Sequence, residues 1–184
     1  MDNAAIADNF ALLAKLMDIH GENPFKSKTY AVAAFNIEKL PVSLQDTPRE
    51  KLFNIKGIGE SVGRKVIEML DTGRLDMLDE IISKTPTGVI EMLNIKGLGP
   101  KKINTIWKEM GIESIGEILY ACNENRLTLF KGFGEKTQKN VQESIEFYFQ
   151  HQGHFLYAQL DEVFTQIDNY LKKDEVFKNL YIYD

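Results

Sequence analysis

Apolar residues recur every three or four positions along most of the chain, which is the spacing of one face of a helix. Residues 2–19 carry such a stripe, and Gly21 ends it. The same pattern predicts helices at residues 26–40, 61–70, 89–93, 101–110, 115–123, 136–149 and 155–173, and shorter ones within 44–52 and 71–82. The last stretch, residues 177–184, contains LYIYD and predicts a short strand. We therefore expect an all-α fold with a C-terminal helix and a short strand.

A glycine-containing segment is repeated along this helical chain. Its copies read NIKGIG at residues 54–59, NIKGLG at 94–99 and LFKGFG at 129–134, and an amphipathic helical stretch follows each of them. We call these segments hairpin 1, hairpin 2 and hairpin 3. Self-similarity at intervals of a few tens of residues indicates a repeated structural unit. A helix, a glycine hairpin and a second helix together predict tandem helix–hairpin–helix units.

The hairpins predict a site for phosphate. The first glycine permits a turn with positive φ, the second permits close approach of a ligand, and Pro100 suits the first position of a helix. Free N–H groups and the helix dipole then favour a phosphate, so such a unit grips a nucleic-acid backbone without reading bases. One copy alone indicates an ordinary turn, but two near-identical copies favour nucleic-acid binding. Hairpin 3 lacks the Asn-Ile step, and a purely structural role stays open for it.

Two groups of residues are candidates for contact with DNA. They are Lys56, Gly57, Gly59 and Ser61 around hairpin 1, and Lys96, Gly97, Gly99, Lys101 and Lys102 around hairpin 2. The net charge of −5 argues against a general polyanion binder. Between residues 51 and 110, however, basic residues outnumber acidic ones ten to eight. Contact with DNA is therefore expected to be local to the hairpins and sensitive to salt.

The composition argues against several other kinds of site. The one cysteine, Cys122, precludes an internal disulfide and fits a reducing cytoplasm. The three histidines are scattered, so we expect no zinc site. No stretch has the length of a membrane span or the layout of a signal peptide, so we expect no membrane partner.

GENPFK-x-x-x-Y at residues 21–30, together with hairpins 1 and 2, carries a resemblance to a known family. Nearly the whole chain resembles the N-terminal half of X-family DNA polymerases, and most closely the bacterial type. The resemblance implies a helical lyase-like domain at 1–84, a second helix–hairpin–helix domain with a degenerate hairpin 3 at 85–150, and the incomplete start of a polymerase palm at 151–184. That palm holds Mg2+ with paired aspartates after a Gly-Ser step. Neither pattern occurs in this sequence, so we expect no polymerase activity from this chain.

The resemblance also implies a partner and an activity. The partner is gapped or nicked double-stranded DNA, bound by a monomer in the bacterial cytoplasm, associated with the nucleoid. In some members the first domain removes 5′-deoxyribose phosphate as a lyase. Lys65 matches the Schiff-base nucleophile, and Lys26 and Tyr30 match the positions that bind the 5′-phosphate and shape the pocket. Ser61 and Phe25 depart from the family, because they replace a second lysine and, in some members, a histidine.

The family's hairpins also bind a monovalent cation, Na+ or K+, through main-chain carbonyls. By position these carbonyls belong to Phe53, Ile55, Ile58, Leu93, Ile95 and Leu98. Carbonyls have no side-chain signature, so the sequence alone neither supports nor excludes a cation.

Three alternatives stay open. Lys65 is equally well interpreted as a solvated lysine on a helix. The hairpins also fit a non-enzymatic scaffold that positions DNA or a protein partner, which Ser61 favours. In the third alternative they pack as protein–protein elements, and the negative net charge is its only support.

Overall fold

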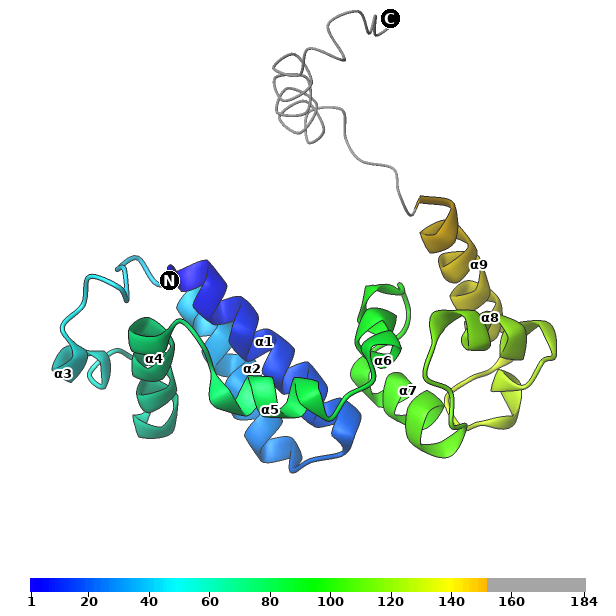
Figure 1. Cartoon of the computed structure of the whole chain (residues 1–184), viewed down its shortest axis with the longest axis horizontal. Coiled ribbons are helices and arrows are strands. Elements are labelled where there is room, and N and C mark those ends of the chain that lie inside the picture. The colour runs from blue at the N-terminus through cyan, green and yellow to red at the C-terminus, as the bar shows by residue number, and fades with distance from the viewer. Residues whose placement is uncertain (152–184) are drawn as a thin grey trace, which may run out of the picture. The chain divides into compact units, whose positions relative to one another are not determined.

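The computed structural model describes residues 1–151 of the chain (Figure 1). The chain divides into a compact unit of residues 1–146 and a second unit from residue 147 onward. Every regular element among the described residues is helical, which confirms the prediction of an all-α fold. The helix predicted at 155–173 and the strand predicted at 177–184 lie outside the described residues.

The helices follow the predicted apolar stripes. Their bounds are α1 Asn3–His20, α2 Pro24–Glu38, α3 Arg49–Leu52, α4 Glu60–Thr72, α5 Asp76–Ser83, α6 Thr87–Glu91, α7 Pro100–Asn104, α8 Ile115–Asn123 and α9 Glu135–His151. Short 3-10 helices lie at Met92–Asn94 (η1) and Leu127–Leu129 (η3), and a π-helical turn lies at Thr105–Glu109 (η2). One prediction was wrong: residues 101–110 are not a single α-helix, because the winding changes from α to π after Asn104.

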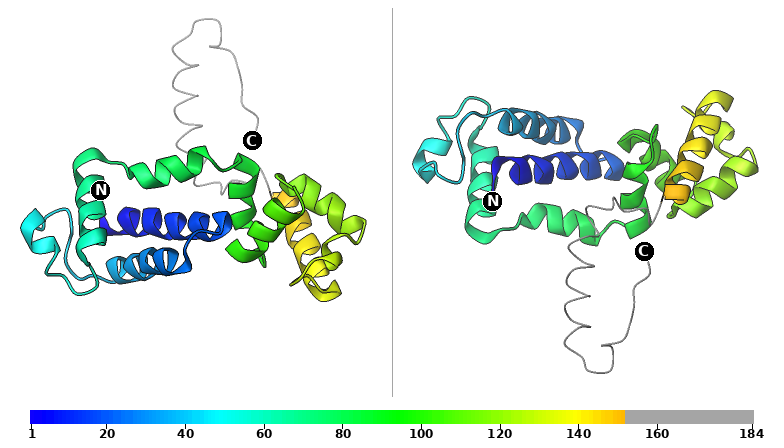
Figure 2. Two further views of the ribbon diagram at one scale, coloured as in Figure 1. Left: turned by 90° about the horizontal axis from the view of Figure 1, so that it is seen from below. Right: turned by 90° about the horizontal axis from the view of Figure 1, so that it is seen from above.

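Helix α1 is the centre of the N-terminal half. The Asp2 side chain caps it by accepting a hydrogen bond from the Ala5 N–H at 2.8 Å, and Gly21 ends it with a φ of 72°. Figure 2 shows α1 between α2 and α5. The fully buried side chains of α1 include Ile6, Phe10, Leu13, Leu16 and Met17. The ring of Phe10 stacks on Tyr30 of α2 with centroids 5.7 Å apart, so α1 and α2 share one apolar core.

The segment around the domain boundary predicted between residues 84 and 85 is packed. Thr85 is buried, and its hydroxyl donates to the Ile81 carbonyl at 2.6 Å. A Cβ at Gly88 would collide with the backbone carbonyl of Glu113, so only glycine permits this close approach. The residues on both sides of this boundary are therefore ordered, and the division at residues 84 and 150 stays a prediction.

The C-terminal end of α1 contacts the segment that follows hairpin 2. Asn104 donates from Nδ2 to the Ile19 carbonyl at 2.8 Å, and the ring of His20 meets that of Trp107 edge to face at 5.0 Å. Nε2 of His20 lies 2.7 Å from Oγ1 of Thr85. Because the Thr85 hydroxyl hydrogen already points at Ile81, Nε2 is the donor in this pair. The π-helical turn η2 carries Trp107 and begins next to Asn104, so the change of winding coincides with this contact.

The surroundings of His20 also change its ionisation. Partial burial, followed by the nearby charge of Lys108, lowers the pKa of His20 from its ordinary value. Glu22 opposes the shift, and Lys84 adds to it. His20 is therefore neutral at pH 7, which suits its place between the Thr85 hydroxyl and the edge of an aromatic ring.

Candidate nucleic-acid interface

The three hairpins share one backbone geometry. The φ angles of their first glycines are 93° at Gly57, 91° at Gly97 and 94° at Gly132. In each hairpin the N–H of the residue after that glycine donates to the carbonyl of the residue two positions before the glycine. The bonds are Ile58 to Ile55 at 3.0 Å, Leu98 to Ile95 at 3.1 Å and Phe133 to Phe130 at 3.2 Å. The predicted positive-φ turn is confirmed, and hairpin 3 forms it without the Asn-Ile step.

An apolar residue anchors each turn in the core. Ile58, Leu98 and Phe133 stand between the two glycines, and each is at most 4% exposed. The glycines on either side are exposed. Each hairpin therefore has a buried centre and an exposed backbone, which is the form that a backbone-binding loop needs.

The second glycine of hairpins 1 and 2 begins a helix. Gly59 and Gly99 have extended backbone conformations, with ψ of 173° and 167°, and are the N-cap residues of α4 and α7. No side chain of the described residues caps either helix. The first N–H groups therefore stay available to an anion, and the helix dipole adds partial positive charge there.

The charges beside the three helix starts differ. Helix α4 begins with Glu60, whose carboxylate pairs with Arg64 at 2.6 Å. Helix α7 begins with Pro100 and two lysines, and α9 begins with Glu135 and Lys136. An acidic side chain at the first helical position competes with a phosphate for the helix N-terminus. Hairpin 2 is therefore the most favourable of the three for an anion.

The lysines predicted to contact DNA are not equivalent. Lys56, Lys96 and Lys101 are exposed beside their hairpins, and Ser61 is exposed on α4. Lys102 is half-buried, and its ammonium donates to the Gly97 carbonyl at 2.9 Å. Lys96 and Lys101 are therefore exposed next to hairpin 2, whereas the ammonium of Lys102 is bonded to the hairpin itself.

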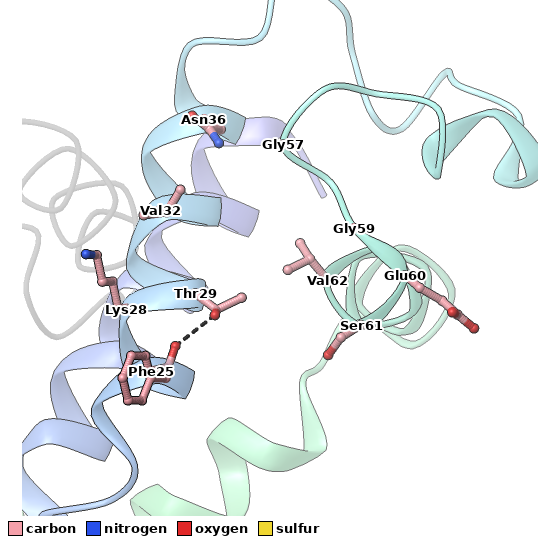
Figure 3. Close-up of a pocket in the computed structure, with 10 residues that line it drawn as sticks. All are labelled: Phe25, Lys28, Thr29, Val32, Asn36, Gly57, Gly59, Glu60, Ser61 and Val62. Atoms are coloured by element: carbon pink, nitrogen blue, oxygen red, sulfur yellow. Dashed lines mark hydrogen bonds between the residues drawn. The ribbon is translucent and has the colours of Figure 1, made fainter.

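A cleft of about 570 Å3 lies between α2 and hairpin 1. It is lined by Phe25, Lys28, Thr29, Val32, Asn36, Gly57, Gly59, Glu60, Ser61 and Val62. Figure 3 shows Val62 pointing across it toward α2, while Lys28 and Glu60 point away on opposite sides. Phe25 is 81% exposed at its rim. The cleft is mainly apolar and opens beside the free backbone of hairpin 1.

The three residues predicted to carry lyase chemistry do not line this cleft. Lys26 is exposed on α2, and Lys65 is half-buried on α4. Tyr30 is 6% exposed, and its hydroxyl lies 3.8 Å from the sulfur of Met77. The two positions that depart from the family, Phe25 and Ser61, do line the cleft. Their phenyl and hydroxyl groups bring no positive charge to it.

The carbonyls predicted to bind a monovalent cation lie on hairpins 1 and 2. Those of Ile55 and Ile95 each accept one N–H group, and a carbonyl oxygen keeps a second lone pair for another partner. These oxygens are hard donors of the kind that Na+ and K+ prefer. Within residues 1–151, no three His, Cys, Asp or Glu side chains are grouped to hold a metal. The cation stays a prediction.

Sequence reasoning missed three residues of this region. Asn36 lies directly under Gly57, where an added Cβ would be 2.5 Å from its Nδ2. Lys28 and Val62 line the cleft, and neither was singled out. Only the stripe of α4 that contains Val62 gave a signal, and it indicated core packing.

None of the helices within residues 1–151 is long and apolar enough to cross a membrane.

Known families and proteins match this arrangement. The family described as "Helix-hairpin-helix domain" matches residues 1–75, and the "SAM-like Helix-hairpin-helix tandem" matches residues 89–146. The DNA polymerase/3'-5' exonuclease PolX of Bacillus subtilis is 28% identical over 133 residues, which are 72% of this chain and 23% of that protein. DNA polymerase lambda of Rattus norvegicus is 30% identical over 119 residues, which are 63% of this chain and 19% of that protein.

The chain is homologous to parts of PolX and of DNA polymerase lambda, and it contains the two helix–hairpin–helix regions that the family models match. The resemblance to the X-family DNA polymerases and the tandem helix–hairpin–helix fold are both confirmed. The X-family homology and the hairpin geometry together support a DNA-binding role for this part of the chain. The chain spans less than a quarter of the length of these two polymerases. The tandem match extends over hairpin 3, so hairpins 2 and 3 belong to one structural unit.

Proposed function

We propose that this chain binds gapped or nicked double-stranded DNA through backbone phosphates at hairpins 1 and 2. The observation that carries the proposal is the shared hairpin geometry, with uncapped helix N-termini directly after Gly59 and Gly99. Phosphate oxygens accept hydrogen bonds from such N–H groups, and exposed lysines beside them add charge. Because no base edge is read, binding depends on the shape and the ends of the DNA rather than on its sequence.

The cleft beside hairpin 1 supports a preference for a gap. A continuous duplex offers paired bases and no free end, whereas a gap offers an end whose sugar and base are unstacked. Phe25 provides an exposed ring, and Val32 and Val62 provide an apolar wall, next to the backbone of Gly57 and Gly59. An unpaired base gains from contact with an aromatic ring.

The test is fluorescence anisotropy on a one-nucleotide gapped duplex, with and without a 5′-phosphate, over a salt series. We expect the gapped DNA to bind more tightly than an intact duplex of the same length. Lys101→Glu should weaken binding more than tenfold at low salt and flatten the salt dependence. Lys15→Glu is the matched control, because it makes the same charge change on the exposed face of α1.

Two results would refute the proposal. Equal affinity for gapped and intact DNA removes the preference for a gap. Equal effects of Lys101→Glu and Lys15→Glu remove hairpin 2 as the contact and leave only a general charge effect.

A second candidate function is 5′-deoxyribose-phosphate lyase chemistry through Lys65. It is favoured by the position of Lys65, one helical turn after Ser61 on the helix that forms one wall of the cleft. Nζ would attack the C1′ aldehyde of the opened sugar and expel water to form a Schiff base. Removal of a C2′ proton would then break the C3′–O bond and release the downstream strand with its 5′-phosphate, and water would hydrolyse the remaining Schiff base to free Nζ. The uncharged lining at Phe25 and Ser61 favours the competing interpretation, a non-enzymatic DNA-binding scaffold.

Borohydride trapping separates these two candidates. A lyase gives a covalent adduct with a 5′-deoxyribose-phosphate substrate, and Lys65→Arg abolishes it while binding to gapped DNA persists. A scaffold gives no adduct in the unsubstituted chain.

We further propose that Na+ or K+ binds at the hairpin carbonyls. The residues that would hold it are Phe53, Ile55 and Ile58 in hairpin 1, and Leu93, Ile95 and Leu98 in hairpin 2. A bound cation would add positive charge beside the phosphate. Replacing KCl by choline chloride at equal ionic strength should then weaken binding to gapped DNA, whereas equal affinity in both salts would contradict the cation.

A further inference from the structure

Lys101 and Lys102 are neighbours in sequence, but their surroundings differ. The side chain of Lys101 is exposed, and its ammonium has no hydrogen-bond or ion-pair partner among residues 1–151. Lys102 is half-buried, and its Nζ donates to the Gly97 carbonyl at 2.9 Å. We infer that Lys101 contacts the DNA phosphate, whereas Lys102 is a positioning residue that holds hairpin 2 in its binding shape.

The bond from Lys102 fixes the peptide group at the tip of hairpin 2. Gly97 has a φ of 91°, a conformation that residues with a side chain rarely adopt. Glycine adopts it readily but also adopts several others, so glycine alone does not fix the turn. In the peptide that follows it, the Leu98 N–H donates to the Ile95 carbonyl at 3.1 Å, and the Gly97 oxygen accepts from Lys102. Both polar groups of that peptide are therefore engaged, so the peptide plane is held from both sides.

The other hairpins do not have this bond. Five residues after the first glycine, where hairpin 2 has Lys102, hairpin 1 has Val62 and hairpin 3 has Thr137. Val62 is buried and has no donor. Hairpin 1 is instead supported from outside, because the Asn36 side chain of α2 packs against Gly57. Nothing lies within 4 Å of a Cβ built at Gly97 or Gly132, so hairpin 2 has the Lys102 bond where hairpin 1 has Asn36, and hairpin 3 has neither.

The same ammonium faces hairpin 3. It lies 6.0 Å from the centroid of the Phe133 ring, at the outer limit of a cation–π contact. Phe133 is 2% exposed and anchors the turn of hairpin 3. Lys102 is thus placed between the two hairpins of the tandem unit, on the inner side, whereas a phosphate approaches the exposed N–H groups after Gly99.

The inference rests on the proposed DNA-binding function for the role of Lys101, and its test has an arm without DNA. The variants are Lys101→Met, Lys102→Met and Lys102→Arg, because methionine keeps the apolar stem and arginine keeps a donor. Binding to the gapped duplex is measured across a salt series by anisotropy. Amide exchange of Leu98 and Gly99 is measured by NMR on the free chain.

The slope of the logarithm of the binding constant against the logarithm of the salt concentration should become shallower by about 0.9 in Lys101→Met, and amide exchange should not change. Lys102→Met should keep the slope, weaken binding about three- to tenfold and speed exchange at Leu98. Lys102→Arg should restore both. The inference is overturned if Lys102→Met flattens the slope as Lys101→Met does, or if it leaves exchange at Leu98 unchanged. Absence of salt-dependent binding in the unsubstituted chain would instead refute the proposed function, and the exchange arm would still decide the role of Lys102.

Discussion

Replacing the first glycine of each hairpin by alanine tests how the turns are supported. Gly57, Gly97 and Gly132 have φ angles of 93°, 91° and 94°, so the three variants meet the same backbone strain. Their surroundings differ. A Cβ at Gly57 would lie 2.5 Å from Nδ2 and 3.1 Å from Cγ of Asn36, whereas nothing lies within 4 Å of a Cβ at Gly97 or Gly132.

The structure gives the expected order of the losses in stability. A left-handed residue with a side chain costs about 1–2 kcal/mol, which applies to all three variants. At Gly57 the Asn36 side chain must also leave its rotamer, which adds roughly 0.5–1.5 kcal/mol. Gly57→Ala should therefore lower the free energy of unfolding by about 1.5–3.5 kcal/mol, roughly 0.5–1.5 kcal/mol more than each of the other two.

Urea unfolding followed by circular dichroism measures these differences. A second set of variants in an Asn36→Ala background removes the obstructing amide, so the extra cost at Gly57 should disappear there. Equal losses at Gly57 and Gly97 would refute the reasoning. So would an excess at Gly57 that persists without the Asn36 amide.

Three further predictions follow from charge and burial. The lowered pKa of His20 means that this residue binds a proton more readily in the unfolded chain than in the folded one. The urea midpoint should therefore fall as the pH falls below about 6.5, and His20→Gln should make the midpoint depend less on pH. Burial raises the pKa of the Cys122 thiol to about 11, so DTNB at pH 8 should label the folded chain about 100-fold more slowly than the urea-unfolded chain; equal rates would contradict the burial. Glu60→Gln removes an acid from the start of α4 and releases Arg64, so affinity for gapped DNA at low salt should rise about two- to fivefold; no gain would mean that hairpin 1 meets no phosphate.

Local patterns in the sequence were enough to predict the helices and the hairpins. The apolar stripes of residues 2–19 and 115–123 correspond to α1 and α8, because burial of one face is what stabilises these helices. The positive φ of Gly57 and Gly97 was also predictable, because a tight turn between two helices needs a residue without a Cβ.

What the sequence did not show depends on residues that are far apart along the chain. Asn36 under Gly57 and Asn104 on the Ile19 carbonyl are single polar side chains with no periodic partner. The π-helical turn at Thr105–Glu109 has an ordinary helical pattern in the sequence. Its winding differs where α7 meets α1, and a local pattern carries no information about that contact.

The candidate site was predicted in part, for the same reason. The exposed glycines and lysines of hairpins 1 and 2 lie where their motif suggests. Proximity in the motif could not separate Lys101 from Lys102, because the separation comes from the direction of each side chain on α7. The placement of Lys26, Tyr30 and Lys65 outside the lining of the cleft likewise depends on the packing of α2 against α1 and on the position of α4 across the cleft.

The common backbone of the three hairpins has a consequence for how such a chain can be altered. A glycine with positive φ and a buried apolar residue are common to all three turns, while the charged residues Glu60, Lys101 and Glu135 lie at the start of the next helix. The conformation of the turn and the charge beside it therefore depend on different residues. A change of Glu135-Lys136 to the Pro-Lys of hairpin 2 would remove the acidic side chain from the start of α9, so hairpin 3 is expected to become more favourable for an anion while it keeps its turn.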